Sequence, residues 1–388
     1  MVYTMYSMKL PELIENKILE QIGIPDLNWK SARIHNKKLN RIRNQMYNLA
    51  DDFAQTLSSA DKYSDAYFAY NFPANLMKAI AVMQQVRNLY PALLAGQTDL
   101  NICDIGCGEG AGMFGIYYGL ENFEKIRFTG FDTSPAMLKK CKAMMQYIKK
   151  SDVRIHFRLL RQDLSHGLLK KKSDKYNIIV LTNSLVEMFT DQNIPVNFIE
   201  RLLKSCSDNG VIIVLEPATK QLSRRLMILR ASIINLGKAQ VLLPCLHVEE
   251  CPLMDVRQQK DWCHQSIAWH VPEYLKILNQ GLNREIDRLK FSYLVIAQKD
   301  FPMTPINAFL VISSLLLEKG RQRCYLCTQQ GRIELVRLKR DKSQANKAFD
   351  TIRKGDVIML DKIIEKRPDY WQVADNSGIK IVNRLISK

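Results

Sequence analysis

The stretch Asp104-Ile105-Gly106-Cys107-Gly108-Glu109-Gly110 decides the fold. It follows a strand-like run at residues 101–105 and precedes a run with helical character. Glycines at such a turn let the backbone approach a ligand where side chains would clash. A glycine turn between a strand and a helix is typical of ligand-binding sites in sheets with Rossmann-like connectivity.

An aspartate follows the glycine turn at the sequence distance expected of a ribose-binding carboxylate. Asp132 lies 132 − 106 = 26 residues after Gly106, at the end of the next predicted strand. A carboxylate there can bind a ribose diol. It could instead cap the helix that begins near Pro135, a function shared with Thr133 and Ser134. A nicotinamide-binding site would have glycines spaced as G-x-G-x-x-G, whereas the glycines here follow the spacing G-x-G-x-G.

The glycine spacing, with Asp104 before it, resembles the first motif of class I methyltransferases, which use S-adenosylmethionine. The resemblance implies a cofactor site at the strand ends, with Asp104, Gly106, Gly108 and Gly110 at the methionine part, Asp132 at the ribose and Asp163 at the adenine edge. Asn183 and Glu187 face the same pocket if the fourth strand ends near Thr182.

Strand-like runs alternate with helical stretches in the middle of the chain, at residues 101–105, 126–131, 153–159, 176–182 and 211–215. This alternation predicts an α/β fold with a parallel sheet, of the Rossmann-like class I methyltransferase type. Apolar positions spaced three and four apart predict a helical N-terminal region. A turn at Gln330-Gly331 between strand-like runs predicts a small β-rich C-terminal appendage. We expect domains at 1–95, 96–300 and 301–388, with a loop-like, Cys-rich insertion at 242–272.

The sequence does not reveal a catalytic group. After the fourth strand it reads Leu181-Thr182-Asn183-Ser184-Leu185-Val186-Glu187, without the acidic-or-Asn, Pro, Pro, aromatic tetrad common in amino-methylating enzymes. It also lacks a Pro-Cys nucleophile for attack on pyrimidines. Because the sulfonium is already activated, methyl transfer mainly requires in-line positioning of the acceptor. Binding of the cofactor without turnover therefore remains an alternative.

Positive charge predicts a polyanionic partner. The chain has 56 Lys and Arg against 39 Asp and Glu, a net charge of +17 and a pI of 9.4. Three basic runs contribute to it: Lys30, Arg33, Lys37, Lys38, Arg41 and Arg43; Lys220, Arg224, Arg225, Arg230 and Lys238; and Arg337, Lys339, Arg340, Lys342, Arg353 and Lys354. Each alone is typical of a solvated helix face, but together they favour RNA over DNA as the partner.

Cysteine usage points to reduced thiols. The chain has nine cysteines and no recognisable export signal, which argues against a disulfide framework. Cys245, Cys251 and Cys263 stand near prolines and histidines. Thiolates suit an iron-sulfur cluster, while cysteine plus histidine could hold zinc. The five residues between Cys245 and Cys251 exceed usual zinc-ribbon spacing and favour iron-sulfur.

Several motifs together resemble the methyltransferase-like proteins of the mitochondrial small ribosomal subunit and their bacterial relatives. They are Glu216-Pro217-Ala218-Thr219, Cys-x-His-x-x-x-Cys-Pro at 245–252, Asp261-Trp262-Cys263-His264, Lys290-Phe291-Ser292-Tyr293-Leu294-Val295, Cys327-Thr328 with Gly331, and Gly355-Asp356. The resemblance implies a [4Fe-4S] cluster on Cys245, Cys251, Cys263 and Cys327, and a function in small-subunit assembly.

Cys324 is a rival fourth ligand, because Cys324 and Cys327 form a C-x-x-C pair. If residues 323–327 form a strand, the two side chains point to opposite faces, which favours Cys327. His247 and His264 are interpreted as neighbours of the site rather than ligands.

We therefore predict an S-adenosylmethionine-dependent methyltransferase that carries an iron-sulfur cluster and acts on small-subunit rRNA or on the assembling subunit. The alternatives are a non-catalytic RNA-binding assembly factor and a zinc-containing methyltransferase of a protein or small molecule. The apolar run at 306–317 is too short to span a bilayer, so no membrane partner is expected. A cytoplasmic location is expected, with the mitochondrial matrix as the alternative.

Overall fold

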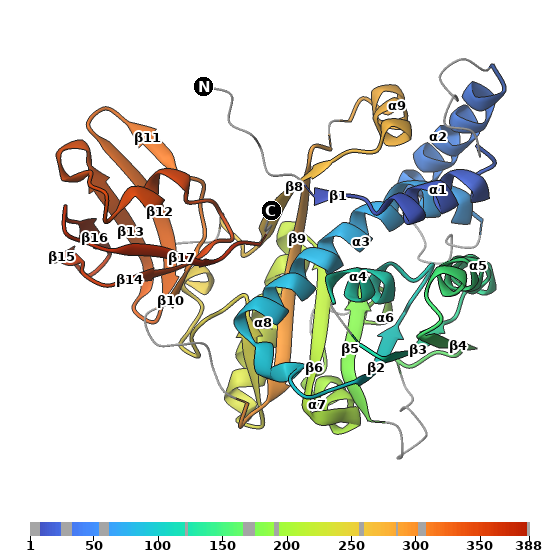
Figure 1. Ribbon diagram of the computed structural model, residues 1–388, viewed down its shortest axis with the longest axis horizontal. Helices are drawn as coiled ribbons and strands as arrows, with labels where there is room; N and C mark the ends of the chain where they lie inside the picture. Colours follow the sequence, from blue (N-terminus) through green and yellow to red (C-terminus); the bar gives the residue numbers. More distant parts are fainter. Residues whose placement is uncertain are drawn as a thin grey trace. The chain divides into compact units, whose positions relative to one another are not determined.

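The computed structural model describes residues 8–24, 33–53, 62–120, 123–165, 175–189, 194–255, 260–284, 286–301 and 308–385. The chain forms two compact units (Figure 1). The first unit comprises Met1–Met83, Gly96–Thr190 and Ile267–Leu289. The second comprises Gln84–Ala95, Asp191–Ser266 and Lys290–Lys388. Each unit thus takes its residues from segments that are far apart in the sequence.

Parallel strands form the centre of the first unit. Their spatial order is β5 (Tyr176–Thr182), β2 (Asp99–Ile105), β3 (Lys125–Asp132) and β4 (Ile155–Arg161). The α4 helix (Ala111–Gly119) follows β2, and α5 (Pro135–Ser151) follows β3. The predicted α/β fold with a parallel sheet is confirmed. Because the strands are parallel, the carboxyl ends of β2, β3 and β5 meet at one edge.

One predicted strand boundary was wrong. The run at 153–159 was expected to be the third strand, whereas β4 begins at Ile155. Val153 is 81% exposed and lies in a turn. The Asp152 side chain accepts a hydrogen bond from the Arg154 amide (3.0 Å), and this bond closes the turn before the strand. The local side-chain interaction therefore outweighs the β propensity of valine.

Three helices make up most of the described part of the N-terminal region. They are α1 (Glu12–Gln21), α2 (Arg33–Phe53) and α3 (Ser64–Leu89). Within the first unit, Tyr47 on α2 donates a hydrogen bond to the carbonyl of Gly281 (2.9 Å), at the end of α9 (Glu273–Gly281). Tyr70 on α3 donates to the Asn279 side chain (2.7 Å). These bonds connect helices that are more than 200 residues apart in the sequence.

Antiparallel strands open the second unit. Strand β9 (Arg288–Gln298) pairs with β6 (Cys206–Pro217) and with β7 (Ala239–Leu243). The α7 helix (Val196–Ser205) precedes β6, and α8 (Lys220–Leu236) follows it. Thr219 caps α8 by accepting a hydrogen bond from the Leu222 amide, and Gly237 ends it in the left-handed conformation.

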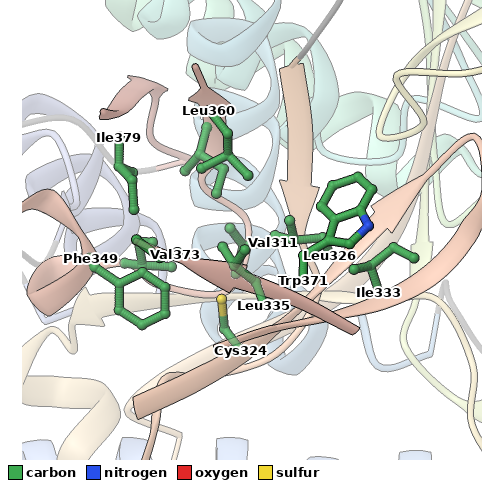
Figure 2. Packing of buried hydrophobic residues seen from close by; sticks show 12 residues of the cluster. Val311, Cys324, Leu326, Ile333, Leu335, Phe349, Leu360, Trp371, Val373 and Ile379 are labelled. Carbon is green, nitrogen blue, oxygen red and sulfur yellow. The ribbon is translucent and has the colours of Figure 1, made fainter. Parts of the chain in front are cut away.

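The C-terminal part of the second unit is a separate sheet. Its strands run in the order β15 (Ile364–Arg367), β16 (Tyr370–Val373), β13 (Gly331–Leu338), β12 (Arg321–Thr328), β10 (Ala308–Val311), β14 (Val357–Leu360) and β17 (Ile379–Asn383), with β11 (Leu316–Glu318) on β12. Cys324, Leu335, Phe349 and Trp371 pack in its apolar core (Figure 2). The predicted Gln330-Gly331 turn connects β12 to β13.

The segment at 242–272 was predicted to be loop-like throughout, and this was wrong at its end. Gln265–His270 forms β8, which pairs in parallel with β1 (Met8–Lys9). Ile267, Ala268 and Trp269 are buried in this strand. Their apolar run was the signal for a strand, but the Cys, Pro and His residues before it masked that signal.

Candidate cofactor site and cysteine site

The loop after β2 needs its glycines for two separate reasons. Gly106, Gly108 and Gly110 have φ values of 67°, 50° and 93°, a region in which side chains are strained. At Gly106 there is also no space, because an added Cβ would lie 2.5 Å from the Cβ of Ser184. Because these positions carry no side chains, a ligand could contact the backbone of the loop directly.

Asp132 connects this loop to the end of β3. Its Oδ2 accepts a hydrogen bond from the Gly108 amide (2.7 Å), and its Oδ1 accepts one from the Ser134 amide (2.8 Å). The N-cap of α5 is Ser134, whose hydroxyl accepts from the Met137 amide. Ser134 is therefore the cap itself, and Asp132 supports the turn before α5 through the Ser134 amide, while its carboxylate lies at the end of β3.

A pocket of about 1060 Å³ lies over the loop in the first unit. Of the predicted site residues, Gly106, Gly108, Asp132 and Asn183 line it, and so does Glu187. Its other walls include residues that the sequence reasoning did not select: Tyr67 and Asn75 from α3, Glu109 from the loop, and Thr182 and Ser184 after β5. Glu109 belongs to the quoted glycine stretch, so it could have been found.

Three predicted residues are placed outside the lining. Asp104 is 1% exposed and accepts a hydrogen bond from the Met113 amide (2.9 Å), so it stabilises the first turn of α4. Gly110 begins α4 as its N-cap. Asp163 is exposed beyond the end of β4, where it accepts hydrogen bonds from the amide and hydroxyl of Ser165.

Several buried polar atoms around the pocket have no partner in the described part of the chain. They are Asp104 Oδ1, Glu109 Oε1, Thr182 Oγ1 and Ser184 Oγ. A buried polar atom without a partner costs about 1–3 kcal/mol. Beside them Asn183 has a φ of 60°, which is strained for a residue with a side chain. Such features cluster where a ligand supplies the missing partners.

Carboxyl groups dominate the electrostatics of this pocket. Burial raises the pKa of Glu109 to about 8, although the positive charge of Lys140 opposes the rise. Burial also raises the pKa of Glu187 to about 7 and that of Asp104 to about 7, and the nearby Asp132 contributes to all three shifts. Glu109, Glu187 and Asp104 are therefore largely or partly protonated near neutral pH, and a cationic ligand would favour their ionised form.

The second candidate site lies entirely in the second unit. Cys245, Cys251 and Cys263 line a pocket of about 370 Å³. Burial raises the pKa of Cys327 well above its usual value, and the adjacent thiols of Cys245, Cys263 and Cys251 raise it further. The four predicted cysteines are thus neighbours. The rival Cys324 is fully buried in the core of the C-terminal sheet.

The α8 helix fixes both cysteine segments through their backbone. Arg230 donates hydrogen bonds to the carbonyls of His247 and Glu249, each at 2.8 Å. The Ser223 hydroxyl pairs with that of Ser292 (2.7 Å), which donates to the carbonyl of Cys263 (2.8 Å). Residues of α8 and β9 therefore hold the segments that carry Cys245, Cys251 and Cys263.

Other contacts join the same segments to the C-terminal sheet. His247 Nε2 lies 3.2 Å from Cys327 Sγ, and Arg332 forms an ion pair with Asp261 (2.9 Å). Burial lowers the pKa of His247 to about 4, and the positive charge of Arg230 lowers it further. His247 is therefore neutral at physiological pH and able to donate to or accept from the sulfur.

The thiolates of cysteine are ligands of both zinc and iron-sulfur clusters. In the described ranges, no three His, Cys, Asp or Glu side chains form a group that could hold a metal ion. A tetrahedral zinc site with Zn–S bonds of about 2.3 Å needs its sulfurs within roughly 4 Å of each other. The four thiols have the ligand chemistry of a thiolate-bound metal group.

The basic runs are only partly on the surface. Arg225, Arg230 and Arg337 are 7%, 2% and 2% exposed, so these three residues do not belong to a solvated basic face. Lys30 and the Arg33 side chain lie outside the described residues. On α2, Lys37 and Arg41 are exposed. In the ranges that the structure describes, no helix is long and apolar enough to cross a membrane.

A family model described as mitochondrial small ribosomal subunit Rsm22 matches residues 61–358, more than three quarters of the sequence. The chain belongs to the Rsm22 family. No curated protein matches this Rsm22 family member.

Solved methyltransferase structures are similar to the chain. The plantazolicin methyltransferase BpumL, in complex with a substrate analogue and SAH, is 15% identical, with a TM-score of 0.36 over 68% of this chain and 98% of its own. A methyltransferase from Geobacter sulfurreducens with bound S-adenosyl-L-homocysteine is 16% identical, with a TM-score of 0.30 over 56% and 90%. Precorrin-6y C5,15-methyltransferase from Geobacter metallireducens is 14% identical, with a TM-score of 0.33 over 57% and 87%.

The buried carboxyls predict a dependence of stability on pH. A carboxyl that titrates at about 8 when folded and near 4.5 when unfolded binds its proton more tightly in the folded state. The stability that Glu109, Glu187 and Asp104 contribute is therefore present below about pH 5 and is lost as pH rises towards 8, by on the order of a few kcal/mol. Denaturant titrations of the ligand-free protein at pH 5 to 8.5 should show that fall.

The Glu109→Gln variant should flatten the profile, because it removes the group with the highest of the three pKa values. The exposed Glu12→Gln serves as the control and should leave the profile unchanged. A wild-type profile that rises between pH 5 and 8 would contradict the assignment.

Proposed function

We propose that this Rsm22 family member binds S-adenosylmethionine in the pocket of the first unit and methylates small-subunit rRNA. The observation that carries the proposal is the set of partnerless buried polar atoms around a glycine loop with positive φ values. The family description, which names the mitochondrial small ribosomal subunit, supports the ribosome as the target. That description also favours the mitochondrial matrix as the alternative to a cytoplasmic location.

The residues of the pocket suggest how the cofactor would be held. The loop backbone at Gly106 and Gly108 would accommodate the methionine part, and Asp132 would accept hydrogen bonds from the ribose hydroxyls. S-adenosylmethionine supplies a methyl group on a positively charged sulfur, and Glu109 and Glu187 provide the complementary charge. Glu187, with a pKa of about 7, is suited to take a proton from the methyl acceptor near neutral pH.

Asp132 and Asp163 provide a matched pair for testing this site. Asp132→Ala should weaken S-adenosylmethionine binding at least about tenfold, because it removes a ribose acceptor and releases the Gly108 amide. Asp163→Ala should bind within about twofold of wild type, because Asp163 lies outside the pocket lining. Isothermal titration calorimetry measures both. Equal affinity of wild type and Asp132→Ala would remove Asp132 from the site.

The α2 helix offers the best surface for RNA. Lys37, Arg41 and Asn44 are exposed at spacings of four and three residues, so they lie on one face of the helix. Residues 30–43 contain no acidic residue. A phosphate backbone bound there would release counterions, which makes the affinity dependent on salt.

Incubation with transcribed small-subunit rRNA and tritium-labelled cofactor tests the activity directly. Wild type should transfer label to the RNA, and Asp132→Ala should not. The double variant Lys37→Glu with Arg41→Glu should bind RNA at least about tenfold more weakly, with a salt slope smaller by up to about 2. Lys366→Glu with Arg367→Glu on β15 is the control of equal charge change. Binding of both ligands without transfer would favour the non-catalytic assembly factor.

We also propose that Cys245, Cys251, Cys263 and Cys327 hold a four-iron cluster. Three of the four buried or half-buried thiols, those of Cys245, Cys251 and Cys263, line one pocket, which supports the proposal. Cys327→Ser should lose most of the iron from anaerobically purified protein, whereas Cys324→Ala should retain it, because Cys324 faces the apolar core. Iron analysis and the visible absorbance measure both. Colourless wild type with one zinc per chain would favour the zinc alternative.

A further inference from the structure

Arg230 is a buried cation that has no acidic partner among the residues that the structure describes. It lies on α8 and is 2% exposed. Its hydrogen-bond partners among the described residues are the carbonyls of His247 and Glu249, and its Nε has no partner. Arg230 also lines one pocket with Cys245, Cys251 and Cys263. Arginine remains charged under all physiological conditions, so this charge needs a counter-charge.

The surroundings of Arg230 supply that counter-charge only if the thiols are ionised. One guanidinium lies beside three of the four thiols, those of Cys245, Cys251 and Cys263. With neutral thiols the site holds an uncompensated buried charge, which is unfavourable for folding.

A metal bound by four thiolates reverses this balance. Four thiolates around one divalent ion, or around a four-iron, four-sulfide core, leave a net charge of roughly −2. A buried anion of that charge is stabilised by a cation at hydrogen-bonding distance. The same guanidinium fixes the loop between two of the ligands, because it bonds the carbonyls of residues 247 and 249, between Cys245 and Cys251.

We infer that Arg230 is the counter-ion of an anionic metal–thiolate group and the positioning residue of the loop that carries Cys245 and Cys251. This inference rests on the proposed metal site, but not on the metal being iron. It assigns two separable functions to one side chain. The charge stabilises the anionic group, and the planar fork of two N–H donors shapes the loop. Lysine retains the charge without the fork, and methionine removes both.

Arg230→Met should have opposite effects on the metal-free and the metal-loaded protein. Without metal, the variant should be at least as stable as wild type, because an uncompensated buried charge is gone. With metal, it should lose the metal to a chelator at least about tenfold faster than wild type. Arg230→Lys should lose it at an intermediate rate. Thermal denaturation and the rate of metal release to EDTA or bipyridyl measure these effects in the full-length protein.

The exposed Lys238→Met, just beyond the end of α8, carries the same change of charge and should match wild type in both assays. If the loaded group is iron-sulfur, Arg230→Met should also have a lower reduction potential than wild type, because the cation favours the more negative reduced form. Equal destabilisation of both forms would make Arg230 a purely structural residue and overturn the inference.

The failure of the metal site and the failure of this inference are distinguishable. Wild type that takes up neither iron nor zinc after anaerobic reconstitution would overturn the proposed metal site together with the inference. Wild type that holds metal, with Arg230→Met holding it equally well and at the same potential, would overturn the inference alone.

Discussion

The hydrogen bond from the Gly108 amide to the Asp132 carboxylate, 2.7 Å long, joins the turn after β2 to the end of β3. The turn can be this tight because Gly106 and Gly108 adopt positive φ values. Strand order then decides what the turn faces. Because β2 lies between β3 and β5, the turn meets Asp132 on one side and Asn183 on the other. The pocket is therefore a consequence of topology and of one polar contact.

The α8 helix has a corresponding function in the second unit. Its inward face presents Ser223, Met227 and Arg230, at spacings of four and three residues, to the two cysteine segments. Neither segment has regular secondary structure at its cysteine residues. Contacts to their backbone, rather than to their side chains, therefore set the positions of the thiols, and the thiols remain available for a ligand.

The sequence predicted those features that depend on local patterns. The alternation of strands and helices predicted the parallel sheet, and the spacing of Gly106 and Asp132 placed both at one pocket. Burial of polar residues depends on tertiary contacts, so charge counting misplaced Arg230. Its position was still visible, because Arg230 follows Leu226 by four residues and precedes Ile233 by three, on the apolar face of α8. Likewise, Arg337 lies two residues after Leu335 and four after Ile333 on β13, so it shares the face of the strand that these core residues occupy.

Both candidate sites hold buried charge that the described part of the chain does not fully compensate. In the first unit, Glu109 and Glu187 keep raised pKa values because no cation compensates their burial fully. In the second unit, Arg230 is buried without a carboxylate. By contrast Arg337, also 2% exposed, is paired with Asp350. The described part of the chain therefore pairs one buried arginine, Arg337, with a carboxylate, but it does not do so for Arg230. Under the two proposals, a cationic ligand would compensate the carboxyls of the first unit, and an anionic metal–thiolate group would compensate Arg230 in the second.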